Sequence, residues 1–261
     1  MEVFRLSFKM QIIWRFDVLM TMVATIGRVV VAWILWSAIF EGKELVGGFT
    51  FEAMLSYYIV CSIISSIDFS SQISGEVSEL IRGGKFSGHM VTPMNPMGFF
   101  SSMVAGESAF HLGFSIVAAI VCVFVFNINI LLTADILRIT LAVILILLGL
   151  CFMACYQYFI GILTFKFMEI GFFHHMQGSI IAFATGSLVP LSLLPTSIIT
   201  VLRYLPFTHV VFTPAMLMTG QIGFGDGLFG LIVLLSWIVA MFLTAQYTYR
   251  RLRVKYDGVG I

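Results

Sequence analysis

Charged side chains are scarce in this chain of 261 residues: they make up 10% of it, whereas hydrophobic side chains make up 60%. A soluble domain carries roughly 25% charged residues, because its surface must face water. We therefore expect lipid to contact most of the exterior. The Lys and Arg residues lie at the ends of apolar runs and form no basic stripe, so no nucleic-acid partner is expected.

Motifs for catalysis and nucleotide binding are missing from the sequence. It has no GxxxxGK[ST] phosphate loop, no HExxH pair and no GxSxG elbow. The four cysteines lie within apolar runs and the five histidines are dispersed, so neither set has the spacing typical of a zinc site. The sequence therefore predicts no catalytic, cofactor-binding or metal site on this chain.

Long apolar runs are what the sequence does contain. A membrane-spanning helix needs about 20 mainly apolar residues. Six runs qualify, which predicts an all-α integral membrane protein with six transmembrane helices, near residues 18–40, 51–71, 99–126, 137–165, 179–200 and 228–249. The fifth run is the least regular, because Pro190 and Pro195 interrupt it.

The distribution of Lys and Arg between the loops predicts the orientation in the membrane. With the N-terminus inside, most of these residues fall on the inner side, and the outer side holds only Lys43, Arg138 and Arg203. Both termini are therefore expected in the cytoplasm, as an even number of crossings requires.

Residues 1–16 form a separate element in front of the first apolar run. Large apolar side chains recur there at helical spacing, while Glu2, Arg5 and Lys9 lie on another side. This pattern predicts a helix that lies in the headgroup layer of the membrane. The alternative is a frayed cytoplasmic tail.

Three ionisable residues fall within or next to the apolar runs: Arg28, Asp68 and Glu107. A charge inside the bilayer is costly, so it usually faces a partner or a water-filled cavity. We hypothesise that Arg28 pairs with Glu107 or with Asp68 inside the helix bundle. The pair could serve packing alone, or it could lie along a polar route for a substrate.

The predicted cytoplasmic segment 73–97 contains the run SGEVSELIRGGKFSGHMVTP. Its first residues favour a short helix that carries Glu76, Glu79 and Arg82, and Gly83-Gly84 should end this helix. A short charged helix held between two spanning helices is suited to contact a soluble partner. The alternative is an ordinary loop.

The predicted outer segment 187–226 is too apolar for a solvated loop and too rich in proline for one straight helix. Short re-entrant helices between spans five and six would explain both properties, since broken backbone at membrane depth must be buried in protein or line a cavity. Just upstream, Gly178, Ala182 and Gly186 form a ridge of small residues that would permit close contact with a second chain.

This layout resembles the ABC type-2 (ABC-2) exporter permeases, which have an interfacial N-terminal helix, six spans, a coupling helix between spans two and three, and re-entrant helices before span six. The resemblance covers the whole chain in topology. It is sharpest in EVSELIRGGKFSGHMVTP and in the run from Gly186 through Leu205-Pro206-Phe207. In detail the sequence is most similar to a group of bacterial ABC-2 permeases of uncharacterised function.

The resemblance implies that residues 1–261 form a single permease domain of an exporter in the cell membrane. It also implies a dimer with a second permease, identical or a sister chain, and two ATPase subunits that hold ATP and magnesium. The residues expected at the ATPase contact are Glu76, Glu79, Arg82 and Lys85. Pro190 and Pro195 would belong to the outer gate.

Two other functions fit a membrane protein of this composition. A secondary transporter or channel would need no ATPase, and Asp68 and Glu107 could then serve as proton sites; however, the chain shows no matched half-repeats with interrupted spans. A membrane-embedded enzyme acting on lipids would need a cluster of acidic or nucleophilic residues, which the sequence lacks. An ATPase whose rate responds to this chain would distinguish the exporter from both.

Overall fold

The computed structural model describes residues 2–11, 15–67, 71–91, 95–167 and 170–255. Within these ranges the secondary structure consists of helices joined by turns and loops, with one isolated β-bridge between Val46 and Phe49. The α-helices are α1 (Glu2–Gln11), α2 (Arg15–Ile39), α3 (Phe51–Ser66), α4 (Ser71–Arg82), α5 (Ser87–Val91), α6 (Pro96–Val125), α7 (Ile136–Ile162), α8 (Thr164–Phe167), α9 (Gly171–Ala184), α10 (Thr196–Leu202), α11 (Phe212–Met218) and α12 (Phe224–Leu252). Three 3-10 turns complete the order: η1 (Leu191–Leu193), η2 (Pro206–His209) and η3 (Arg253–Lys255).

Four of these helical segments are long and apolar enough to cross a membrane: Leu19–Ile39, Pro96–Val125, Ile136–Phe167 and Phe224–Leu252. The predicted all-α membrane architecture is confirmed to this extent. The other two predicted spans are not single long helices in the described residues, because α3 ends at Ser66 and α9 ends at Ala184. Gly186 follows α9 with φ +73, a left-handed conformation that commonly ends a helix.

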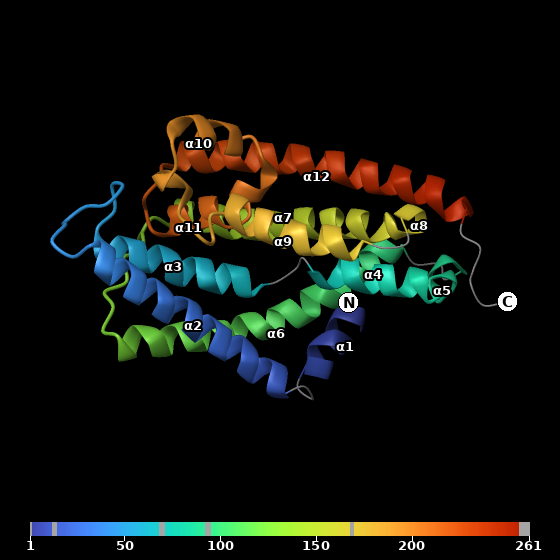
Figure 1. Ribbon diagram of the computed structural model, residues 1–261, viewed down its shortest axis with the longest axis horizontal. Helices are drawn as coiled ribbons and strands as arrows, with labels where there is room; N and C mark the ends of the chain where they lie inside the picture. The colour runs from blue at the N-terminus through green and yellow to red at the C-terminus, as the bar shows by residue number, and fades with distance from the viewer. Residues whose placement is uncertain (1, 12–14, 68–70, 92–94, 168–169, 256–261) are drawn as a thin grey trace.

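The helices form an elongated bundle with two distinct ends (Figure 1). The start of α3 lies at one end together with α10 and α11, whereas α4, α5 and α8 lie toward the other end, beside the C-terminal end of α12. We refer to these as the outer and inner ends, following the orientation that the basic residues predict.

Helix α1 packs against α6 at Gly106. A Cβ at Gly106 would lie too close to the Phe4 carbonyl oxygen and 3.2 Å from the Phe8 amide nitrogen, so only glycine allows this approach. Phe8 and Phe110 add an edge-to-face contact with ring centroids 5.3 Å apart. The predicted N-terminal helix therefore exists, and Leu6 and Met10 remain exposed on it.

Helices α2 and α6 run in parallel, in a register fixed by two hydrogen bonds between side chains. Thr21 Oγ1 lies 3.1 Å from His111 Nδ1, and Thr25 Oγ1 lies 3.3 Å from Ser115 Oγ. The constant offset between the partners places Arg28 level with Ala118, on the outer side of both hydrogen bonds. Arg28 is therefore in the middle of a long apolar helix.

Helix α4 packs alongside α7, near the inner end, at a second glycine. A Cβ at Gly161 would lie 2.8 Å from the Val77 Cβ and 3.2 Å from the Ser74 Cα, so the two backbones approach closely. The Thr164 hydroxyl donates a buried hydrogen bond of 3.0 Å to Ser78 Oγ. Helix α4 is therefore packed in close backbone contact with α7 and is hydrogen-bonded to the start of α8.

The segment between α9 and α12 is broken into short helices. The helical pair Thr196–Leu202 and Pro206–Met218 is bent by 85°. A Cβ at Gly149 would lie 3.3 Å from the Val210 Cα, and Gly149 is halfway along α7 (Ile136–Ile162). The second segment of this pair thus reaches the middle of a helix that is long enough to span the membrane.

Candidate translocation cavity

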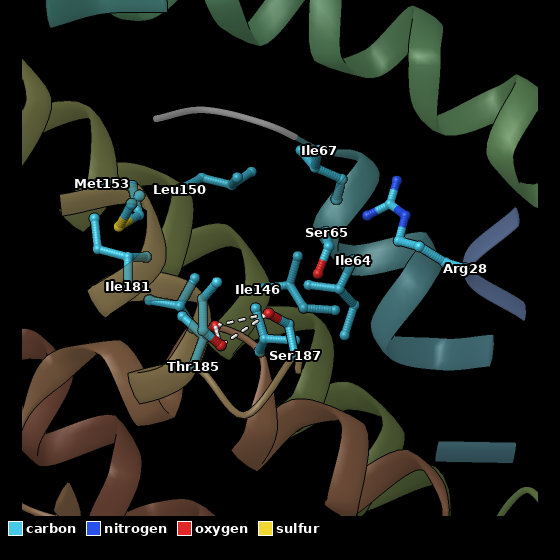
Figure 2. A pocket seen from close by; sticks show the side chains of 14 residues that line it. Arg28, Ile64, Ser65, Ile67, Ile146, Leu150, Met153, Ile181, Thr185 and Ser187 are labelled. Atoms are coloured by element: carbon cyan, nitrogen blue, oxygen red, sulfur yellow. Dashed lines mark hydrogen bonds between the residues drawn. The ribbon is translucent and has the colours of Figure 1, made fainter. Parts of the chain in front are cut away.

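Two adjoining cavities lie beside Arg28, between α2, α3, α7 and α9. Their volumes are about 260 Å³ and about 480 Å³, and they share Arg28, Ser65, Ala182 and Ser187 as lining residues. Figure 2 shows the smaller one, in which Arg28 extends from α2 toward the end of α3 near Ser65 and Ile67. We call the two together the Arg28 cavity.

The walls of the Arg28 cavity are mainly apolar, with a few polar groups. Ile146, Leu150 and Met153 line it from α7. Across from Arg28, the Thr185 hydroxyl donates to Ser187 Oγ at 3.3 Å, and the Ser187 hydroxyl donates to the Ala182 carbonyl at 3.0 Å (Figure 2). Among the described residues, Arg28 is the one charged side chain that lines this cavity.

The structure tests only one of the two partners hypothesised for Arg28. In the register of α2 and α6, Glu107 lies three turns further toward the inner end than Ala118, an offset of about 16 Å along the helix. The structure therefore does not bring Arg28 and Glu107 together, because an arginine side chain cannot bridge that distance. Asp68, the other hypothesised partner, lies outside the described residues.

Glu107 instead faces the acidic side of α4. Glu76 is half-buried, and its pKa is raised first by this burial and then by the negative charges of Glu107 and Glu79. Among the four residues expected at the ATPase contact, Glu76 thus differs from the others, since it is turned partly into the bundle. This orientation could not be predicted from the sequence, because the contact depends on how α4 and α6 pack.

Replacing Glu76 with glutamine should stabilise the protein at neutral pH. A raised carboxyl pKa means that folding disfavours the charged form, so the folded protein loses stability as the pH rises above the ordinary value of about 4.3. E76Q removes this cost, and we expect a Tm higher by about 1–2 °C at pH 7.5, with the difference disappearing near pH 4. The exposed Glu44 of the outer loop supplies a control, E44Q, which should leave Tm unchanged. A lower Tm for E76Q at pH 7.5 would contradict the burial and repulsion described here.

The other three residues of the expected ATPase contact are exposed at the inner end. Glu79, Arg82 and Lys85 face outward, whereas Ile73, Val77 and Ile81 of the same segment are buried. The charged face of α4 is therefore presented outward while its apolar face is fixed to the bundle.

A phenylalanine that the sequence analysis missed anchors the turn after α4. Phe86 is fully buried, and its ring packs edge to face against Phe165 at 5.3 Å and Tyr249 at 6.3 Å. It follows Gly84, which has φ +72 and turns the chain. The position of Lys85 is thus fixed by its two neighbours, a turn glycine and a buried aromatic ring.

At the outer end, two tyrosines of α3 hold the loop that follows α9. The Tyr57 hydroxyl donates a buried hydrogen bond of 2.8 Å to the Gly186 carbonyl, and the Tyr58 hydroxyl donates one of 2.9 Å to the Leu188 carbonyl. Pro190 is buried at the start of η1, and Pro195 is exposed at the start of α10. Both prolines therefore begin short helices, where a missing N–H costs little.

His209 holds the innermost turn of this outer segment. It is 2% exposed, and its ring nitrogens hydrogen-bond the Thr213 hydroxyl at 2.8 Å and the Arg203 carbonyl at 2.9 Å. A Cβ at Gly230 of α12 would lie 2.6 Å from His209 Nδ1. Dispersed histidines carry no sequence signal for such a role, because all three partners are set by the tertiary fold.

Within the described ranges, no three His, Cys, Asp or Glu side chains are grouped as a metal site would require. No curated protein and no solved structure matches the chain at a significant level. The model of one protein family, described as "ABC-2 family transporter protein", matches residues 26–260. This match covers nearly the whole chain, including the Arg28 cavity and the charged face of α4. The chain belongs to the ABC-2 family of membrane transporter proteins.

Proposed function

We propose that the chain is the transmembrane permease subunit of an ATP-binding cassette exporter. It would form the substrate path and couple to a separate ATPase subunit, which would hold ATP and magnesium. Membership in the ABC-2 transporter family supports this proposal, as does a multi-pass architecture with four long apolar spans.

The proposed topology has six crossings, with both termini in the cytoplasm. Besides the four long helices, α3 would form the second crossing and α9 the fifth, α4 would lie in the cytoplasmic coupling segment, and α10 and α11 would be re-entrant. The contact of Val210 with the midpoint of α7 supports the re-entrant arrangement, because a surface loop would not reach that depth. Pro190 and Pro195 would then lie at the outer gate.

The substrate path would run through the Arg28 cavity, closed on its open side by a second permease, identical or a sister chain. The exposed face of α9 supports such a partner. A Cβ at Gly178 would meet nothing within 4 Å, and Ile180 is 57% exposed. A helix that presents a small residue beside exposed apolar ones is suited to close packing with another helix.

The observation that carries the coupling proposal is the close packing of α4 against α7 at Gly161, next to the charged residues of α4. A motion imposed on Glu79, Arg82 or Lys85 would reach α7 through the contact at Gly161, because neither backbone can yield there. Since α7 also lines the Arg28 cavity, the path from the inner surface to the cavity is short.

Reversing the charge at Lys85 should uncouple the ATPase without unfolding the permease. Lys85 is exposed, so K85E should leave Tm unchanged. Co-expressed with its ABC ATPase and reconstituted in liposomes, K85E should lower the permease-stimulated rate of ATP hydrolysis about fivefold or more. K43E makes the same charge change in the outer loop and should have no effect. The proposal would be overturned if the wild-type permease did not change the rate of ATP hydrolysis by the ATPase. Transport by the reconstituted chain without any ATPase would also overturn it.

A further inference from the structure

A long apolar groove runs between α3, α6 and α7, separate from the route proposed for the substrate. Its volume is about 530 Å³, and every lining side chain except that of Ser108 is apolar. It reaches from Phe4 of α1 to Leu132 in the loop before α7. The groove therefore follows the direction in which the spanning helices cross the membrane.

The groove opens to the exterior of the bundle. Leu132, Val143 and Leu147 line it and are about half exposed, at 54%, 46% and 59%. Water gains little in such a site, because an ordered water needs two or more polar partners. A void of this size would also leave the lining side chains without contact partners. In a bilayer, the apolar material that can fill it is a hydrocarbon chain.

Two basic residues lie on the helix that closes one end of the groove. Phe4 lines the groove from α1, and the exposed Arg5 and Lys9 lie one turn apart on the same helix. Glu2 is the only acidic residue of α1, so this helix itself carries two cations and one anion. Basic residues on a helix at the membrane surface attract anionic headgroups.

We infer that this groove binds an anionic phospholipid of the inner leaflet, with one acyl chain between α6 and α7 and the headgroup beside Arg5 and Lys9. The lipid would have a structural consequence, because Ile64, Ile67, Ile146 and Leu150 line both the groove and the Arg28 cavity. These four side chains form one shared wall. A chain packed on its lipid side would support the wall from behind.

Native mass spectrometry of the purified full-length chain tests the inference. The protein is titrated with dioleoylphosphatidylglycerol or dioleoylphosphatidylcholine, which have the same chains but differ in charge. We expect one tightly retained phosphatidylglycerol, with at least fivefold preference over phosphatidylcholine. Ala109 is exposed and lines the groove, so A109W should fill the site and abolish retention. A240W places the same side chain at an exposed position of α12 outside the groove and should retain the lipid.

The headgroup contact is tested separately from the chain contact. The double variant R5Q/K9Q should still bind lipid but lose the preference for phosphatidylglycerol, whereas K43Q in the outer loop should keep it. In the wild-type protein, a phosphatidylglycerol with a diazirine in its acyl chain should label peptides of α3, α6 and α7 above all others, so the result does not depend on A109W folding. The inference would be overturned if A109W and the wild-type protein retained the lipid equally, or if the diazirine labelled all helices uniformly. It would also be overturned if A109W lost a bound protein partner rather than a lipid.

Discussion

Replacing His209 with alanine should lower the Tm of the purified protein by about 10 °C. The substitution removes a buried ring and leaves the Arg203 carbonyl and the Thr213 hydroxyl without their present partner. Loss of a large buried side chain together with its hydrogen bonds costs about 2–4 kcal/mol. In a chain of this size each kcal/mol corresponds to about 2–4 °C in Tm.

The loss should be local to the outer segment, and two further variants can show this. G230A should also lower Tm, because its new methyl group would meet the same imidazole ring, which two hydrogen bonds hold in place. G225A lies in the same helix, where a Cβ would meet nothing within 4 Å, and should be neutral or slightly stabilising. Wild-type Tm in both H209A and G230A would mean that His209 does not hold the outer segment to α12.

The long spans could be predicted from the sequence because apolar length alone decides whether a helix can cross a bilayer. The same criterion fails for α3 and α9. Apolar composition continues past Ala184, but the left-handed Gly186 and the following prolines end the helix there. Hydropathy records the environment of a residue and not its backbone conformation, so the predicted fifth span at 179–200 and the observed α9 overlap only in part.

The candidate site could be predicted from the sequence only in its components. Arg28 was identified because a charge within an apolar run is rare and costly. Its level along α6 could not be predicted, since the register of α2 against α6 depends on Thr21 and Thr25 meeting His111 and Ser115. A single sequence contains no information on such pairs, which is why Glu107 was considered as a partner although it lies far along the helix.

The anchoring residues were missed for a related reason. Tyr57 and Phe86 are ordinary aromatic residues in the sequence, and burial against segments distant in the chain gives them their roles. Gly161 is similar, because a glycine in an apolar helix is common in membrane proteins. Its importance becomes visible only once Val77 is found beside it.

Substituting Gly161 with alanine should both destabilise the protein and uncouple it from its ATPase. The new Cβ would lie 2.8 Å from the Val77 Cβ and 3.2 Å from the Ser74 Cα, and neither atom can rotate away. Helix α4 would have to move off α7, which would strain the hydrogen bond between Thr164 and Ser78. Overpacking of this kind costs about 1–3 kcal/mol, and we expect Tm to fall by about 5 °C.

The direction of the change in Tm distinguishes a packing clash at Gly161 from a general effect of replacing a helical glycine with alanine. G113A in α6 would meet nothing within 4 Å, and alanine is the better helix former, so G113A should raise Tm slightly. If the proposed coupling route is correct, G161A should also reduce permease-stimulated ATP hydrolysis, whereas G113A should not. In a double-mutant cycle with V77G, which removes the opposing Cβ, the Tm losses of the two single variants should be less than additive. If G161A and G113A shift Tm in the same direction and both preserve stimulation, α4 and α7 do not transmit motion through their contact at Gly161.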